Sequence, residues 1–580
     1  MTNYEIAQAL AAIADHLEIR NENAFKVRAY RNGARSVREM TRPLAEMVGA
    51  GADLTSLPGI GKELAKRITE LVTTGRTERL EGLEREMPGS VIGLMDLGGI
   101  GPKRARELFE TLGVTTLTEL ERAIDDGRLV DVPGFGERTA DRLRRAIRER
   151  QSRPERIRLA DADRLVVSLI GWMQEAPGLE RVEAAGSWRR RVETVGDIDL
   201  LAVAADAEAV MAHFVGYPGF ARIEASGGTR GTAILSAGPQ VDLRIVARES
   251  YGAALHYFTG SKAHNVAVRQ LGVRRGLRIS EYGVFRLSES GEERIGGESE
   301  ADVFSAVGLD WVPPELREDR GEVEASGRGG LPDLIEMSDL RGDLHMHSTW
   351  SDGRDTIEAM AGACRDRGYA YMAIADHSRS TTIAGGLGPN RLEEQWREID
   401  LVREIVPAIR VYRSMEVDIL ADGSLDLPDE HLERLDLVIV SIHSQMRMPA
   451  KRMTDRVIRA LQHPCVDILA HPTGRRMPQR PPFEIDMESV LRAAAELDVA
   501  VEVNSLPQRL DLNDVHVRRA RELGLMVAID TDAHSVRDLA GILYGVGQAR
   551  RGWVERSGVL NALDLPAFDA WRRRKRKQRN

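Results

Sequence analysis

The chain has 580 residues, more than one hydrophobic core usually supports, so we expect several domains. Hydrophobic residues make up 42% and charged residues 29%, as in ordinary soluble globular proteins. No segment approaches the ~20 apolar residues that a membrane-spanning helix needs. The first 20 residues predict an amphipathic helix and not a signal peptide, and the two cysteines offer no disulfide framework. These features predict a cytoplasmic protein.

The net charge of −9 does not by itself indicate a nucleic-acid binder, but the basic residues are clustered. Basic runs lie at 144–158, at 189–191 and in the tail from Trp571. A local basic patch can bind phosphates on an acidic protein, although a single charge run is more often a solvated face. For the tail, nonspecific DNA affinity and disorder both stay open.

Residues 1 to about 150 predict helices, because apolar residues recur at helical spacing between glycine-rich turns. Three turns of the form Gly–apolar–Gly open basic helical segments and resemble helix-hairpin-helix motifs. Glycine lets the backbone approach a ligand, and a helix N-terminus offers free N–H groups to a phosphate. One such turn is often a plain connection, but three predict sequence-independent contact with DNA. The glycines concerned are Gly59, Gly61, Gly99, Gly101, Gly134 and Gly136.

From about residue 160 the pattern changes to that of a mixed α/β domain, with short strand-like runs between helical stretches. Residues 312–333, rich in Pro and Gly, are the best linker candidate. Strand-like runs then alternate with helical segments, which favours a barrel or another parallel-sheet α/β domain. In such folds the active site lies at the carboxyl ends of the strands.

Two of these strands carry aspartates on one face. Asp197 and Asp199 point one way because residues two apart share a face of a strand, and Asp242 alternates with apolar neighbours in the same manner. Three converging carboxylates repel one another unless cations neutralise them, and carboxylate oxygens suit Mg²⁺. Two such ions ~4 Å apart are a common device for phosphoryl transfer. The alternative is that the aspartates simply begin or end strands on a solvent-exposed surface.

The longer pattern GSWRR…GDID…D resembles the nucleotidyltransferase palm of family X DNA polymerases. Residues 257–261 with Asn265 resemble that family's sugar- and base-contacting segment, and residues 280–283 resemble one that packs near the template base. The resemblance covers about residues 1–318. It implies that Asp197 and Asp199 bind both metals and that Asp242 helps to bind the one that activates the primer 3′-hydroxyl. The implied nucleotide-binding residues are Gly186, Ser187, Arg190, Gly196, Tyr257, Phe258, Gly260 and Asn265.

The second half carries a further set of metal-ligand residue types. A single histidine is more often structural, but six of the 13 histidines follow predicted strands here. Mixed His and carboxylate ligands suit Zn²⁺ or Mn²⁺. The candidate ligands are His345, His347, Asp352, His377, Glu416, His443, His471, Asp532 and His534.

This spacing resembles the PHP (polymerase and histidinol phosphatase) domain, a distorted (β/α)₇ barrel with about three metal ions. All nine ligand positions of that family are filled, which implies an active site with Mn²⁺-dependent 3′→5′ exonuclease and 3′-end or abasic-site cleavage. The metals would lower the pKa of a bound water, with Glu416 as the bridging ligand. Arg475 and Arg476 could hold a phosphate or lie on a solvated surface.

The predicted fold joins all-α N-terminal domains, an α/β palm and thumb, and the barrel. We expect a lyase-like domain at 1–80, fingers at 81–153, a palm at 154–250, a thumb at 251–318, a linker at 319–338 and a PHP domain at 339–575. The predicted function is a monomeric repair polymerase that adds deoxynucleotides from their triphosphates at short gaps or on primer-template DNA and cleans 3′-ends. The alternatives are a DNA-binding scaffold with inactive centres, or a PHP domain acting on a small phosphate ester.

The lyase domains of this family use a lysine that forms a Schiff base with an abasic sugar. Alignment on the first glycine pair places Arg67 there, and a guanidinium is a poor nucleophile. Lys62 and Lys66 lie nearby but point elsewhere on a helix. We therefore predict weak or absent lyase activity, and borohydride trapping of the wild-type protein on an abasic 5′-end would contradict this.

Overall fold

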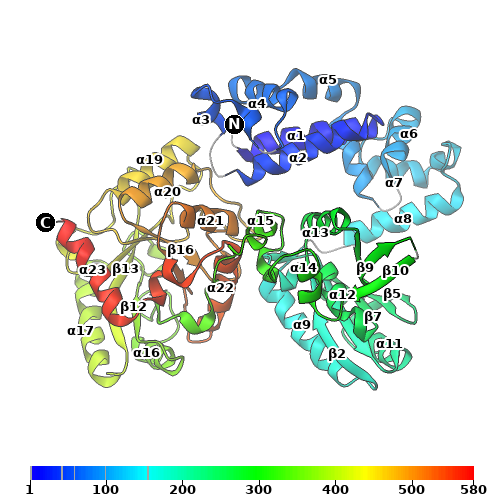
Figure 1. Cartoon of the computed structure of the whole chain (residues 1–580). Helices are drawn as coiled ribbons and strands as arrows, with labels where there is room; N and C mark the ends of the chain where they lie inside the picture. Colours follow the sequence, from blue (N-terminus) through cyan, green and yellow to red (C-terminus); the bar gives the residue numbers. More distant parts are fainter. Residues whose placement is uncertain are drawn as a thin grey trace. The chain divides into compact units, whose positions relative to one another are not determined.

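The computed structural model describes residues 3–40, 44–57, 59–97, 100–152, 156–289 and 291–579. The chain forms two compact units, Met1–Pro154 and Glu155–Asn580; both are drawn in Figure 1. Within the described ranges, no helix is long and apolar enough to cross a membrane.

The first unit is helical, as predicted. Its helices are α1 (Asn3–Ile19), α2 (Ala24–Glu39), α3 (Leu44–Gly49), α4 (Lys62–Thr74), α5 (Glu78–Glu86), α6 (Pro102–Leu112), α7 (Leu117–Asp125) and α8 (Glu137–Ser152). Helical spacing buries one face of each: Leu64, Ile68 and Leu71 of α4, for example, point into the core. The buried side chains form two clusters, one built on α1 to α5 and the other running from the end of α1 to α8.

The second unit begins with a five-stranded sheet of order β2-β4-β7-β6-β5, in which β4 and β7 run parallel. Its elements are α9 (Leu159–Gln174), β2 (Leu179–Ala184), α10 (Gly186–Arg189), β4 (Asp197–Ala204), α11 (Ala207–Val215), β5 (Phe220–Ser226), β6 (Arg230–Leu235) and β7 (Gln240–Val246). Apolar residues of β4 and β7 pack against α9 and α11, so these strands bury one face and leave the other for polar groups.

A smaller layer follows. It comprises α12 (Tyr251–Thr259), α13 (Lys262–Arg274), β8 (Leu277–Ser280), β9 (Gly283–Ser288), β10 (Gly291–Gly296) and α14 (Glu300–Ala306). The segment expected to be a linker differs from that expectation, because it contains α15 (Glu322–Ser326) and packs on this layer. Val312, Leu316 and Val323 are buried in the same cluster as α13 and α14. These apolar side chains, spaced between the prolines and glycines, explain why the segment folds back.

The last part is the predicted barrel. Its strands are β11 (Gly342–Met346), β12 (Tyr371–Ile374), β13 (Arg410–Asp418), β14 (Leu437–Ser441), β15 (Ile468–Leu469), β16 (Ala500–Asn504) and β17 (Val527–Asp530), paired in chain order and all parallel. The sheet nearly closes, since the backbone N–H of His347 donates to the Ala533 carbonyl at 2.8 Å.

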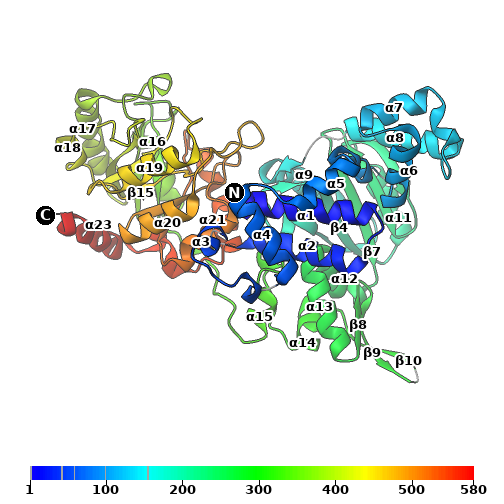
Figure 2. The same ribbon diagram turned by 90° about the horizontal axis from the view of Figure 1, so that it is seen from above.

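Helices alternate with these strands and surround them, and Figure 2 shows several of them from above. They are α16 (Ile357–Asp366), α17 (Pro389–Ile405), α18 (Asp429–Leu432), α19 (Ala450–Leu461), α20 (Met487–Glu496), α21 (Asp514–Glu522), α22 (Ile542–Arg551) and α23 (Leu565–Arg579). Strand residues alternate between the barrel interior, such as Ala373, and the helix-facing layer, such as Met372. Phe568 of α23 stacks on Tyr371 at 4.5 Å and helps to fill the interior.

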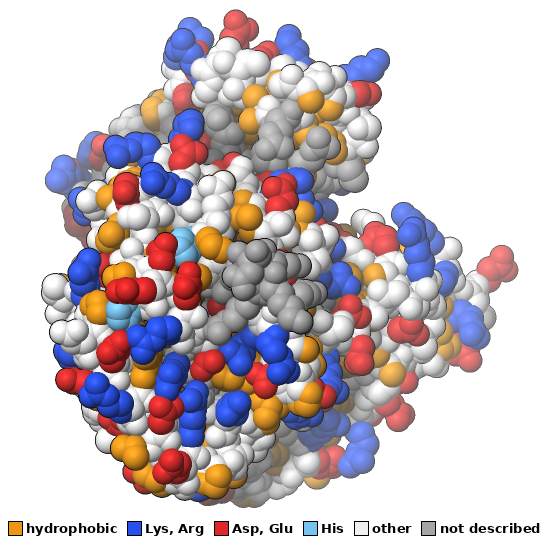
Figure 3. Space-filling view, turned by 90° about the vertical axis from the view of Figure 1, so that its left-hand side faces the viewer, with side chains coloured by type: hydrophobic (Ala, Val, Ile, Leu, Met, Phe, Trp, Pro, Cys, Tyr) orange, Lys and Arg blue, Asp and Glu red, His pale blue; other side chains and the backbone are white. Residues whose placement is uncertain are grey.

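Charged side chains of both signs are interspersed on the face shown in Figure 3. Some of the described members of the basic runs have acidic partners, whereas Arg156 donates to Thr194. Arg144 pairs with Asp125 and Asp141, and Arg158 pairs with Asp161. The side chains of the tail beyond residue 573 lie outside the described residues. This face therefore carries charges of both signs.

Candidate active sites

The three aspartates lie side by side on the first sheet. Asp199 of β4 and Asp242 of β7 are register partners of the parallel pair, and Asp197 lies two residues before Asp199 on the same face. Alternation places Ile198 and Val241 in the core, so the carboxyl groups point to the opposite side. The structure thus brings together the carboxylates that the sequence pattern predicted to converge.

The electrostatics of this cluster suit a cation. Burial, together with the negative charges of Asp197 and Asp242, raises the pKa of Asp199 to about 7. Thr232 and Gln240 each donate a hydrogen bond of 2.6 Å to Asp242 and fix its orientation. A divalent ion among the three carboxylates would remove their mutual repulsion, and oxygen ligands of this kind fit Mg²⁺.

The predicted phosphate-binding turn touches this cluster. Gly186 has φ +65°, and a Cβ atom there would collide with Oδ2 of Asp199, so only glycine lets the turn approach. The buried Oγ of Ser187 has no hydrogen-bond partner among the described residues. Gly196 is exposed directly before Asp197. A phosphate ligand next to the three carboxylates could accept a hydrogen bond from this unpaired, buried hydroxyl.

Arg190 has partners of its own in this structure. Its Nε donates to Glu318 at 3.0 Å and its Nη1 donates to the Thr259 carbonyl at 2.8 Å. The neighbouring Arg189 forms a bidentate pair with Glu300, and Arg191 pairs with Asp163. This basic run is therefore paired with acidic side chains instead of forming a solvated face.

The predicted sugar- and base-contacting segment ends α12. Tyr257 and Phe258 are partly buried with their rings edge to face. The amide of Asn265 donates to the Tyr257 and Gly260 carbonyls at 2.7 and 3.2 Å, and its Oδ1 has no partner within the described ranges. Asn265 thus shapes this segment through its amide nitrogen. Contact with a base stays a prediction, and the atom available for it is Oδ1. Tyr282, in the turn between β8 and β9, is 60% exposed.

The glycine turns of the first unit have the expected geometry. Gly61 and Gly101 are the N-cap residues of α4 and α6, and neither provides a side-chain cap. The free backbone N–H groups in the first turn of each helix can therefore donate to a ligand. Gly59 and Gly134 adopt positive φ angles of 77° and 83°, and Gly136 directly precedes α8. Gly99 lies outside the described residues. Contact of these turns with DNA stays a prediction.

Arg67 of α4 is held in an ion-pair network. Its guanidinium contacts Glu63 at 2.9 Å and Glu70 at 2.9 Å, and these partners keep its pKa above the ordinary value although burial alone would lower it. Lys62 and Lys66 are exposed. Arg67 therefore has a structural role, which agrees with its being a poor nucleophile.

The nine predicted ligands of the barrel lie together at the carboxyl ends of its strands. Eight of them form three overlapping groups, and within each group the ligand atoms lie within 4.8 Å of one another. The first group is His347, Asp352, His377 and His534. The second is His345, His347 and Asp532, and the third is His377, Glu416 and His443. His471 joins them through Glu416, whose Oε1 lies 2.8 Å from its Nε2.

Glu416 lies at the centre of this cluster, the position expected for a bridging ligand. Its carboxylate oxygens lie within 4 Å of five histidines, namely His345, His347, His377, His443 and His471. Burial alone would raise the pKa of Glu416, but the charges of His443, His377 and His345 hold it well below its usual range. An ionised, buried carboxylate among imidazoles can bridge two cations.

The donor set fits metal ions. The Nε2 atoms of His345 and His347 lie 3.3 Å apart, so both nitrogens could bind one cation. The buried Nδ1 atom of His471 has no hydrogen-bond partner in the described part of the chain. Imidazole nitrogens and carboxylate oxygens together suit Zn²⁺ or Mn²⁺.

Sequence reasoning missed the residues that orient these ligands. Oε1 of Glu502 lies 2.7 Å from Nδ1 of His345, and Asn504 donates to Asp532 at 3.0 Å. Nε of Arg509 lies 3.3 Å from Oδ2 of Asp532, so a positive charge adjoins the candidate ligands. The signal available in the sequence was Glu502 and Asn504, two polar residues that alternate with apolar residues along strand β16.

Arg475, for which a phosphate-binding role and a solvated surface position were both left open, does not lie on the surface. It is buried, donates to the Leu510 carbonyl, and pairs with Glu193 beside the first sheet at 2.7 Å. Arg476 is exposed and pairs through its backbone with Arg480. A contact between residues 282 positions apart could not be read from local sequence.

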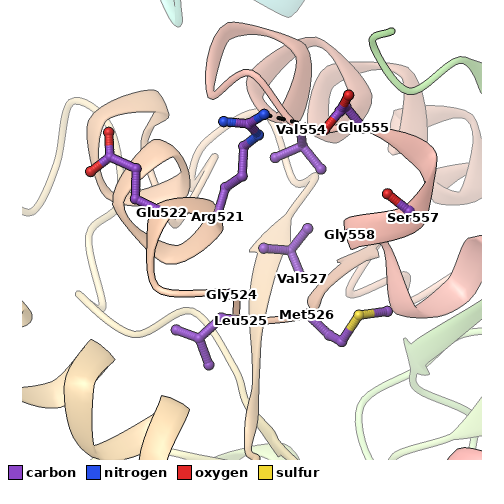
Figure 4. A pocket seen from close by; sticks show the side chains of 10 residues that line it. All are labelled: Arg521, Glu522, Gly524, Leu525, Met526, Val527, Val554, Glu555, Ser557 and Gly558. Atoms are coloured by element: carbon purple, nitrogen blue, oxygen red, sulfur yellow. Dashed lines mark hydrogen bonds and ion pairs between the residues drawn. The ribbon is translucent and has the colours of Figure 1, made fainter. Parts of the chain in front are cut away.

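A separate hollow of about 430 Å³ lies beneath the barrel between residues 521–527 and 554–558. Figure 4 shows Arg521 reaching Glu555 across it, at 3.2 Å. Val527 at its wall begins β17, whereas Asp532 follows the other end of that strand. The hollow is therefore at the opposite end of the barrel from the metal ligands.

Known proteins match this chain along its length. Residues 254–318 match the family model for a DNA polymerase beta thumb, residues 1–77 a helix-hairpin-helix domain and residues 91–149 a SAM-like helix-hairpin-helix tandem. A Bacillus subtilis (strain 168) protein named DNA polymerase/3′-5′ exonuclease PolX is 38% identical over 99% of this chain and 100% of its own length. Probable phosphatases of Thermoanaerobacter sp. (strain X514) and Acetivibrio thermocellus are each 28% identical, over 38% and 39% of this chain and 89% and 87% of their own lengths.

Replacing Glu502 by Gln is expected to weaken Mn²⁺ binding to the barrel cluster about 10- to 100-fold, because a partner of a ligating histidine sets its orientation and basicity. Calorimetric titration of metal-free protein with Mn²⁺ measures this. Exposed Glu404 on α17 supplies the control, Glu404→Gln, which should bind like wild type. Unchanged affinity in Glu502→Gln would contradict the assignment.

The raised pKa of Asp199 predicts pH-dependent Mg²⁺ binding at the first sheet. Below pH 7 the carboxyl group of the metal-free protein is largely protonated, and the cation must displace that proton. The apparent dissociation constant should therefore rise by up to about tenfold per unit as the pH falls from 7. Mg²⁺ titrations at pH 6 and pH 8 test this, and Asp199→Asn should lose the dependence.

Proposed function

Because this chain belongs to the bacterial family X DNA polymerases that carry a C-terminal PHP domain, we propose that its two ligand clusters divide the polymerase and nuclease reactions between them. The protein is a DNA polymerase and 3′→5′ exonuclease that depends on divalent metal ions. DNA and deoxynucleoside triphosphates are its substrates. The proposal assigns polymerisation to Asp197, Asp199 and Asp242, and exonuclease chemistry to the nine ligands of the barrel.

The observation that carries the polymerase assignment is the pairing of Asp199 with Asp242, next to a turn whose Ser187 hydroxyl lacks a partner among the described residues. Bound Mg²⁺ would supply the charge that activates the primer 3′-hydroxyl and stabilises the departing pyrophosphate. The aspartates would hold it, with Asp242 oriented by Thr232 and Gln240. Ser187 and the turn around Gly186 would bind the β- and γ-phosphates, which positions the α-phosphate for in-line attack.

The sugar and base of the incoming nucleotide would lie on the segment that ends α12. Tyr257 and the backbone from Phe258 to Gly260 would crowd a 2′-hydroxyl and so favour deoxyribose. Asn265 supports that segment through its two hydrogen bonds to backbone carbonyls and leaves Oδ1 for the base. Arg190 would have to exchange Glu318 for phosphate oxygens when the nucleotide binds.

In the barrel, bound cations would supply Lewis acidity for the phosphodiester and acidify a water molecule. Glu416 would bridge them, and His345 would keep its orientation through Glu502. Arg509, whose Nε lies 3.3 Å from Asp532, would hold the scissile phosphate through its charge. We assign Mg²⁺ to the polymerase site and about three Mn²⁺ or Zn²⁺ ions to the barrel.

The physiological reaction we propose is filling of short gaps, with removal of terminal nucleotides and processing of 3′-ends or abasic sites. The glycine turns of the first unit would grip the DNA backbone without reading sequence. A barrel acting on a small phosphate ester is the second candidate, favoured by the probable phosphatases that resemble it. A monomeric state and a cytoplasmic location stay predictions.

Two substitutions separate the centres. Asp199→Ala should lower incorporation on a gapped duplex by at least about 10³-fold while exonuclease activity stays, because it removes a ligand of both palm cations. His345→Ala should do the reverse. Primer extension and degradation, each with Mg²⁺ and with Mn²⁺, measure both activities in the same preparation. If either variant lost both activities or neither, the assignment would be wrong.

A further inference from the structure

One face of helix α22 in the PHP domain covers the proposed nucleotide-binding turn of the palm. Residues Tyr544, Gly547, Gln548 and Arg551 recur at helical spacing and so share that face. Tyr544 packs with Trp188 on the palm cluster of Leu159, Ala162 and Val195. A Cβ atom at Gly547 would lie 3.3 Å from the Cβ atom of Arg191, so the helix backbone is close to the turn.

The turn presents two consecutive carbonyl groups to this helix. The Arg190 carbonyl accepts a 2.8 Å hydrogen bond from Nη1 of Arg551, and the Arg191 carbonyl accepts a 3.2 Å bond from the Gln548 amide. Arg191 has φ +57°, a conformation that a non-glycine residue adopts only when its surroundings enforce it. The two donors from α22 are the groups that bond the carbonyls on either side of this bend.

The side chain of Arg551 is held in place by a second set of contacts within the PHP domain. Its Nε and Nη2 contact Asp514 of α21 at 3.0 and 2.7 Å, and Arg320 contacts the same carboxylate at 2.8 Å. Nη1 of Arg551 also lies 3.0 Å from Oε1 of Glu318, the oxygen that accepts from Arg190. Arg551 is 6% exposed and Gln548 1% exposed, so both sets of bonds are shielded from water.

We propose that Gln548 and Arg551 are positioning residues for the polymerase reaction, so that the PHP domain shapes the triphosphate-binding turn independently of its own metal ions. The inference rests on the proposed role of that turn in nucleotide binding. Arg551 orients the Arg190 carbonyl and shares Glu318 with the Arg190 guanidinium, and Gln548 holds the next carbonyl. Without these donors the bend at Arg191 relaxes, and Ser187 and Arg190 lose their alignment with the β- and γ-phosphates.

The test uses full-length Arg551→Met and Gln548→Leu, which keep side-chain volume and remove the donors. Steady-state incorporation is measured against deoxynucleotide and against gapped DNA. We expect the KM for deoxynucleotide to rise about tenfold in Arg551→Met and about threefold in Gln548→Leu, since each loses hydrogen bonds to the turn. The KM for pyrophosphate in the reverse reaction should rise in parallel. The kcat, the KM for DNA and the exonuclease rate should stay within about twofold of wild type.

Arg550 supplies a matched control on the same helix. It contacts Glu315 at 2.7 Å and the Ile335 carbonyl, and so tethers α22 to its neighbours without touching the turn. Arg550→Met should leave the KM for deoxynucleotide unchanged. An equal rise in Arg550→Met and Arg551→Met would overturn the proposal, because the effect would then come from general docking of the domains.

Ser187→Ala separates this proposal from the function beneath it. If Ser187→Ala raises the KM for deoxynucleotide and Arg551→Met and Gln548→Leu do not, the positioning role is wrong and the nucleotide site stands. If Ser187→Ala has no effect either, the turn does not bind the nucleotide, and both the nucleotide-binding assignment and this proposal are wrong. If a thermal-unfolding measurement shows that Arg551→Met does not fold, the result for Gln548→Leu decides between the two outcomes.

Discussion

Both centres gather buried or half-buried polar groups that a cation would bind, and at the palm sheet the carboxylates repel one another unless a cation lies among them. Three carboxylates meet on the palm sheet, and nine imidazole and carboxylate side chains meet at the mouth of the barrel. Each set needs a rigid support, because a loose chain would let the ligands separate. The support is parallel strand pairing in both cases, which places the ends or faces of neighbouring strands in fixed register. The remaining contacts, such as Glu502 with His345, refine what that register provides.

Much of this could be predicted because it is local. Residues two apart on a strand share a face, so Asp197 with Asp199 and His345 with His347 were readable from spacing alone. The Gly–apolar–Gly turns were readable for the same reason, since glycine there permits a conformation that few other residues adopt. Burial of the alternate positions, such as Ile198 and Val241, agrees with these patterns.

The unpredicted features depend on contacts between distant segments. Arg475 meets Glu193 across 282 positions, and Arg551 meets the Arg190 carbonyl across 361. A basic run such as 189–191 gives no local sign of its partners, so its members read as a phosphate site or a solvated face. The segment at 312–333 read as a linker from its prolines and glycines, and only the thumb core reveals why Val312, Leu316 and Val323 are there.

Closure of the barrel has a consequence for biosynthesis. His345 lies on the first strand, and His347 directly follows that strand. The last strand lies beside the first and is followed by Asp532 and His534. A ribosome therefore synthesises the first two of these nine residues nearly 190 residues before the last two (the Asp343–Thr531 contact spans 188). The nascent chain therefore completes this ligand set only after the palm sheet, which precedes the barrel in the sequence, has been synthesised.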